Sequence, residues 1–158
     1  MNKDIKNKLD LYLTNCLKYV GVKKGEGFCV GIGVNDPKDI DKIQNMLNVK
    51  FSIEYINFLK IYGECCVEGF DLYGIPILKS LHYGKSVIDV TRFYKEEQGW
   101  PGIEDWYVVS DNGGGNPIGI DPEGAVWLSD HDSGFEKIKL ADDFEEFLLK
   151  LLEDRLYD

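Results

Sequence analysis

The chain has 158 residues, of which 44% are hydrophobic, and this length and composition are typical of a globular domain with its own core. Its 28 acidic residues outnumber 18 basic ones, and the formal net charge of -10 argues against nucleic-acid binding, which requires a basic face toward the phosphates. No run reaches the roughly 18 apolar residues of a membrane span, and Met1–Asp4 do not begin a secretory signal, so we expect a single cytoplasmic domain over residues 1–158 with no membrane partner.

The charges are unevenly spread along the chain. Residues 97–136 contain acidic residues but no Lys or Arg, whereas the N-terminal segment up to Lys24 is rich in Lys. A solvated acidic surface is one interpretation of the central segment, and a docking face for a basic protein is the other.

Four cysteines are present, and they lack the spacing of a zinc site or a Cys-x-x-Cys redox pair. We therefore expect Cys16, Cys29, Cys65 and Cys66 to be free thiols in a reducing compartment. A redox role for the adjacent pair is disfavoured, because alternation along a strand would send one side chain inward and the other outward.

The N-terminal half predicts three helices. Residues 3–20 have the three-and-four spacing of an amphipathic helix, which Gly21 ends. After a glycine-interrupted extended stretch over residues 22–34, Asp36 and Pro37 predict the cap and first position of a short helix that ends near Asn48. The glycines of the extended stretch do not complete a dinucleotide-binding fingerprint.

The third helix begins after Ser52, ends at Gly63, and has an aromatic inner face of Tyr55, Phe58, Leu59 and Tyr62. Residues 64–79 then become extended and are expected to begin the sheet, with Phe70, Leu72 and Ile75 packing inward. Residues 84–98 return to helical spacing, and the cluster 99–102 ends that helix in a loop.

The C-terminal part predicts an antiparallel meander followed by a helix. Three apolar runs over 106–110, 118–120 and 126–128 are separated by turn sequences, and Ile138 with Leu140 adds a last short strand. Residues 142–155 carry one apolar stripe and predict the closing helix. The expected fold class is α+β, an antiparallel β-sheet meander packed with N-terminal, middle and C-terminal helices.

Two motifs in this region contain residues that could form a chemical site. The glycine run 111–116 leads into Pro117 and a strand with no basic residue near, which favours a hairpin over a phosphate loop. In an extended Asp130-His131-Asp132, the imidazole would point away from both carboxylates, so these residues are expected to stabilise a turn rather than to converge on a metal ion. The calcium-loop pattern is also incomplete. We expect no catalytic residues, no metal and no cofactor.

The same residues resemble a known family. The C-terminal region is similar to the SUKH superfamily, and more narrowly to its Smi/Knr-like branch, and the similarity extends back through the aromatic helix to cover roughly residues 36–152. Phe51 and Ser52 stand where a Leu-Pro pair usually precedes that helix, and Ser52 can still cap it. The resemblance is carried by Trp106–Val109, Asp111–Gly115, Ile120, Asp121, Gly124–Leu128, Asp130–Asp132, Phe144–Leu148, Ile53–Leu59, Tyr62 and Gly63.

The resemblance implies a binding function. Bacterial members are known as immunity proteins that neutralise polymorphic toxins, many of them nucleases, and fungal relatives act as scaffolds in cell-wall regulation. Our leading hypothesis is a non-catalytic immunity protein whose acidic surface binds a basic cognate toxin. A housekeeping scaffold is the alternative, followed by a small metal-dependent hydrolase centred on Asp111, Asp130, His131 and Asp132. The predicted partner-binding residues are Trp100, Glu104, Asp105, Asp111, Asn112, Glu123, Asp130 and Asp132.

Overall fold

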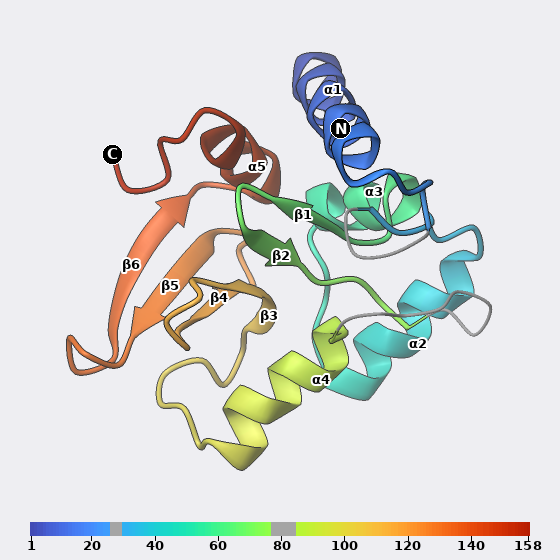
Figure 1. Ribbon diagram of the computed structural model, residues 1–158. Helices are drawn as coiled ribbons and strands as arrows, with labels where there is room; N and C mark the ends of the chain where they lie inside the picture. Colours follow the sequence, from blue (N-terminus) through green and yellow to red (C-terminus); the bar gives the residue numbers. More distant parts are fainter. Residues whose placement is uncertain (26–29, 77–84) are drawn as a thin grey trace.

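The computed structural model describes residues 1–25, 30–76 and 85–158 (Figure 1). The fold is mixed α+β, as the sequence predicts, with helices packed against an antiparallel sheet. In chain order the elements are α1 (Lys3–Val20), α2 (Pro37–Leu47), α3 (Ile53–Ile61), β1 (Cys65–Val67), β2 (Phe70–Leu72), α4 (Val87–Arg92), the π-helical turn η1 (Phe93–Glu97), β3 (Tyr107–Asp111), β4 (Pro117–Ile120), β5 (Val126–Asp130), β6 (Glu136–Ala141) and α5 (Phe144–Leu152).

The predicted meander is confirmed as a four-stranded antiparallel sheet in the order β3-β4-β5-β6. The β3–β4 turn uses Gly113 and Gly115 at φ values of 73° and 85°, which side chains with a Cβ rarely adopt. Because neighbouring strands run in opposite directions, the β3–β4 and β5–β6 turns lie at one end of the sheet. The β4–β5 turn lies at the other end.

The segment expected to begin the sheet forms a separate hairpin instead. Strands β1 and β2 pair with each other, β1 also forms an isolated bridge with Val30, and β2 reaches the main sheet through its extension, where the Tyr73 N–H donates to the Val109 carbonyl at 2.8 Å. The neighbouring Val108 N–H donates a hydrogen bond to the Thr91 hydroxyl of α4 at 2.8 Å. The outer edge of β3 is therefore covered by α4 and this extension, and residues 77–79 of the predicted segment lie outside the described residues.

The predicted helices are confirmed, with local differences at their ends. Helix α1 ends at Gly21 with φ 76°, and α3 begins after Ser52, whose hydroxyl accepts the Tyr55 N–H at 3.3 Å. Instead of one helix over 84–98, α4 changes into the π-helical turn η1, and residue 84 lies outside the described residues. The predicted extended stretch 22–34 contributes an isolated bridge between Val30 and Cys65, and its residues 26–29 are also outside.

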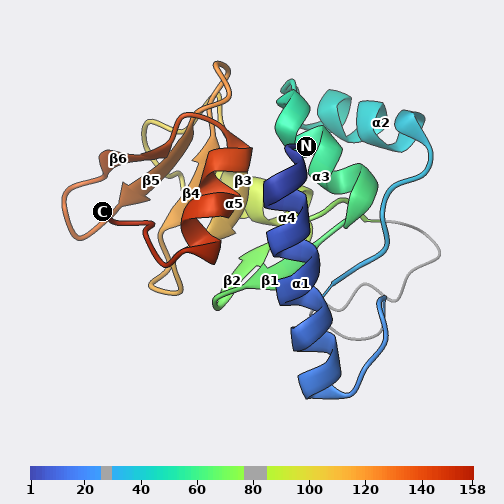
Figure 2. The same cartoon turned by 90° about the horizontal axis from the view of Figure 1, so that it is seen from above.

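The core lies between the inner face of the sheet and helices α1, α3 and α5 (Figure 2). Its centre is an aromatic cluster in which the Tyr55 and Phe144 rings are 5.2 Å apart and those of Phe51 and Tyr107 are 4.7 Å apart. The buried phenols are hydrogen-bonded, since Tyr55 donates to the Tyr73 carbonyl at 2.6 Å and Tyr107 accepts the Ser52 N–H at 2.9 Å. Burial raises the pKa of Tyr107 to about 12.

The outer face of the sheet is crossed by the segment that links η1 to β3. The Trp106 indole of that segment lies over Gly119, where an added Cβ would come within 2.8 Å of the ring. Edge strand β6 brings Lys137 within 5.3 Å of the Trp106 ring centre and Lys139 within 5.9 Å of the Trp127 ring centre. Basic side chains therefore stand beside the acidic segment on this face.

Neither thiol of the adjacent cysteine pair is readily ionised. Cys65 is buried and Cys66 half-buried in β1, in agreement with strand alternation. Burial raises the pKa of both thiols, that of Cys66 to about 11. Among the described residues, none of the helices has the length and apolarity needed to cross a membrane.

Candidate interaction surface

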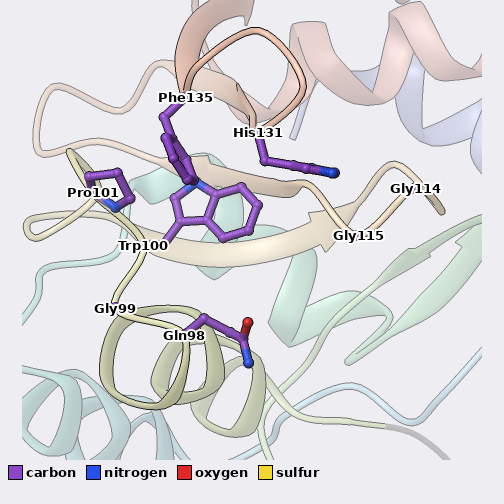
Figure 3. A pocket seen from close by; sticks show the side chains of 8 residues that line it. All are labelled: Gln98, Gly99, Trp100, Pro101, Gly114, Gly115, His131 and Phe135. Atoms are coloured by element: carbon purple, nitrogen blue, oxygen red, sulfur yellow. The ribbon is translucent and has the colours of Figure 1, made fainter.

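A concave surface lies at the end of the sheet that carries the β3–β4 and β5–β6 turns (Figure 3). We define the sheet-end surface as loop 98–101, turn 112–116 and turn 131–135. A cavity of about 320 Å³ opens there. It is lined by Gln98, Gly99, Trp100, Pro101, Gly114, Gly115, His131 and Phe135.

Trp100 is the fixed centre of this surface. Its backbone N–H donates to the Tyr94 carbonyl at 2.9 Å, and its indole Nε1 donates to the Ser129 hydroxyl at 2.8 Å. The ring makes edge contacts with Tyr94 and Phe135, each with ring centres 5.2 Å apart. The indole is therefore held in one orientation while part of it lines the cavity, which is the condition for a preorganised contact residue.

Phe135 carries an exposed apolar ring on a strained backbone. Its φ of 66° lies in the left-handed region, which costs a bulky residue about 1–3 kcal/mol, and 41% of the residue is exposed. Figure 3 shows the Phe135 ring pointing from the β5–β6 turn toward Trp100, and the His131 ring centre lies 5.9 Å from that of Trp100. An exposed aromatic held by its neighbours in an unfavourable conformation is a candidate contact residue.

Asn116 links turn 112–116 to turn 131–135 by hydrogen bonds. This residue is 5% exposed, and its carboxamide oxygen accepts the His131 N–H at 3.1 Å and contacts the imidazole Nδ1. Its amide nitrogen donates to Asp130 at 3.4 Å, while its own backbone N–H donates to the Asn112 side chain at 3.2 Å. One buried side chain thus sets the position of one turn relative to the other.

The geometry predicted for Asp130, His131 and Asp132 is wrong. Strand β5 ends at Asp130, so the next residues turn back, and one ligand atom from each of the three side chains lies within 4.8 Å of the others. The predicted turn-stabilising role is confirmed, since Asp130 accepts the Asp132 N–H at 2.9 Å and the Ser133 hydroxyl at 3.1 Å. The imidazole Nδ1 contacts Asn116, and Nε2 lies 3.2 Å from Asp132.

The predicted partner-binding residues divide between separate parts of the molecule. Trp100, Asn112 and Asp132 belong to the sheet-end surface, and Asp111 and Asp130 are the strand residues directly before its two turns. Glu123 is in the β4–β5 turn at the opposite end of the sheet.

Glu104 and Asp105 lie on the crossing segment. Backbone N–H groups, among them that of Gly102 at 2.9 Å, lower the pKa of the Glu104 carboxyl, and the positive charges of Lys137 and Lys95 lower it further. Asp105 lines a different concavity, together with Lys50, Tyr107 and Asp121. Contact of these two residues with a partner stays a prediction.

The sequence alone does not predict Asn116, His131 or Phe135 as members of this surface. In the sequence, Asn116 resembles the other turn residues before Pro117. Its hydrogen bond to His131 cannot be foreseen from local pattern, because the two residues lie in different turns. Phe135 directly follows Gly134, and a bulky side chain at the end of the predicted 132–134 turn is the local sign that it belongs to this surface.

A family model described as SMI1-KNR4 cell-wall, SUKH_5, matches residues 16–153. The match spans every strand of the sheet, the sheet-end surface and helices α2 to α5. It confirms the resemblance expected over residues 36–152 and extends it into α1. No curated protein matches the chain.

Proposed function

Because this chain belongs to the SUKH_5, SMI1-KNR4 cell-wall, family, we propose that it is a non-catalytic immunity protein that binds and neutralises a cognate bacterial toxin, such as a nuclease, in the cytoplasm. The observation that carries the proposal is the sheet-end surface, where the anchored Trp100 and the exposed Phe135 stand beside Asp132 and the strand-end residues Asp111 and Asp130. The toxin domain is expected to be basic, in keeping with the net charge of -10.

Aromatic and acidic side chains of the surface are proposed to contribute differently to binding. A few well-held aromatic residues usually supply most of the binding free energy of an interface, and Trp100 and Phe135 are suited to that role. Exposed carboxylates such as Asp132 mainly speed the encounter with a basic partner, because their attraction acts at a distance through water. The surface would thus dock on the toxin and cover its active site.

The direct test is a titration of the purified protein against the toxin encoded beside it. Trp100→Ala is expected to weaken binding by at least about 2 kcal/mol, the loss that defines a hot spot. Trp127→Ala is the matched control, because Trp127 is also half-buried but lies outside the sheet-end surface, where it donates to Asp121 at 2.7 Å. Equal affinities of the two variants would place the interface elsewhere.

Salt dependence tests the electrostatic part of the proposal separately. The association rate should fall between low and physiological ionic strength, because screening shortens the range over which exposed carboxylates attract a basic partner to about 8 Å. An Asp132→Asn variant should associate more slowly than the wild type and show a smaller salt effect. A rate that is independent of salt would contradict electrostatic steering.

The cell-wall description of the family favours a scaffold as the second candidate function. A scaffold would bind its partner without blocking an activity. Co-expression distinguishes the two: an immunity protein restores growth to cells that produce the toxin, and its Trp100→Ala variant protects less well. Binding without protection would favour the scaffold.

A further inference from the structure

A second cavity, of about 220 Å³, lies where α4 and η1 meet the end of β3. Its lining combines aromatic and apolar side chains with carboxylates. The lining residues are Lys85, Asp89, Val90, Phe93, Tyr94, Glu97 and Asp111. Tyr94 also contacts Trp100, so this cavity adjoins the sheet-end surface.

The π-helical turn arranges one side of the cavity. The Gln98 N–H donates to the Phe93 carbonyl five residues earlier, at 2.9 Å, and the wider turn ends the helix beside Trp100. Phe93 remains 36% exposed although its ring meets that of Tyr94 edge-on at 5.2 Å. The cavity therefore has an accessible aromatic wall and a buried tyrosine behind it.

The carboxylate of Asp111 is held in place by neutral donors. It accepts the Tyr73 hydroxyl at 2.5 Å and the Gly113 N–H at 2.8 Å. Over residues 1–25, 30–76 and 85–158, no Lys or Arg forms an ion pair with Asp111 or Glu97. Burial raises the pKa of Tyr94 to about 12, and the negative charge of Asp111 contributes to that rise. The carboxylates of Asp111 and Glu97 therefore line the cavity without a direct ion pair among the described residues, and Lys85 supplies a positive charge in the same lining.

The protein's own side chains show that the aromatic wall accepts a cation. The Lys85 ammonium group lies 5.7 Å from the centre of the Phe93 ring, within the range of a cation–π contact. An arginine side chain fits this chemistry better than a lysine, because its planar guanidinium stacks on an aromatic ring and donates to two carboxylates at once. Its apolar stem would lie against Val90 and Phe93.

We propose that this cavity is a binding site for an arginine side chain of the toxin, with Phe93 stacking on the guanidinium and Glu97 and Asp111 accepting its hydrogen bonds. The proposal rests on the proposed function, because it names the group by which the toxin is recognised.

The cavity itself is tested without the toxin. Nα-acetyl-L-arginine amide is titrated into the full chain while the backbone amide resonances of Phe93, Tyr94 and Gly113 are followed by NMR. We expect these resonances to shift, and the neutral analogue Nα-acetyl-L-citrulline amide to leave them in place. Glu97→Gln and Asp111→Asn should each raise the dissociation constant about tenfold, the loss expected for one charge-assisted hydrogen bond.

Glu96→Gln is the matched control, since Glu96 is the neighbour of Glu97 but its carboxylate lies outside the cavity lining and reaches toward Arg92 at 4.0 Å. It should bind the arginine amide like the wild type. Equal shifts with the citrulline amide, or equal losses in Glu96→Gln and Glu97→Gln, would overturn the proposal.

Repeating the variants with the toxin separates the two proposals. If wild type and Glu97→Gln bind the toxin equally tightly, the cavity is not the arginine site and the proposed function still stands. If the arginine amide binds but no toxin does, the cation-binding site is supported and the toxin as the source of the arginine is refuted.

Discussion

Replacing Asn116 by alanine should loosen the sheet-end surface without touching its exposed residues. The change removes the acceptor of the His131 N–H, at 3.1 Å, and the donor to Asp130, at 3.4 Å. A hydrogen bond of normal length contributes about 1 kcal/mol, and the longer one about half as much. Because the Asn116 side chain is almost fully buried, its removal also leaves a small void, and the expected total is about 2 kcal/mol of unfolding free energy.

Urea denaturation measures this loss directly, and the midpoint of thermal unfolding should fall by about 4–8 °C for a chain of this size. Asn45→Ala is the control, because Asn45 is exposed on α2 and its loss should change the unfolding free energy by no more than about 0.5 kcal/mol. The amide resonances of residues 131–135 should shift in Asn116→Ala and not in Asn45→Ala. An unfolding free energy within about 0.5 kcal/mol of the wild type would refute the assignment of Asn116 as the link between the turns.

Three further changes test the fold that supports this surface. Thr91→Val keeps the shape of the side chain but leaves the buried Val108 N–H without its acceptor, so equilibrium unfolding should show a loss of about 1–3 kcal/mol, whereas Thr14→Val on the exposed side of α1 should cost much less. Gly119→Ala forces a methyl group against the Trp106 ring and should cost about 1–3 kcal/mol with a change in tryptophan fluorescence; unchanged stability and emission would show that the ring can move aside freely. The pKa of Tyr107, raised by burial to about 12, means that the folded state keeps a proton that the unfolded phenol loses from about pH 10, so stability should fall as the pH rises from 10 to 12. Tyr107→Phe should make that fall shallower, and an identical slope would exclude Tyr107 as a contributor.

Local signals in the sequence suffice to place the ends of most helices and strands. Asp36 with Pro37, Ser52 and Gly21 act on the backbone within a few residues of themselves, so their effect on helix ends is the same in any fold. The glycines at 113 and 115 likewise specify a tight reversal locally, and the alternation of apolar runs around them predicts the meander. Family membership follows from the same local patterns.

Which residues share a surface depends on tertiary packing. The Asn116 to His131 bond and the contact of Trp100 with Phe135 join segments that are separated along the chain, and local patterns carry no information about such pairs. The same reason explains the β1–β2 hairpin, which stays outside the main sheet because Thr91 and Tyr73 already occupy the edge of β3. It also explains the charge of the outer face, where β6 folds Lys137 and Lys139 back beside a segment that is purely acidic in sequence. Contacts of this kind depend on how strands and helices pack together, and packing is a property of the whole chain.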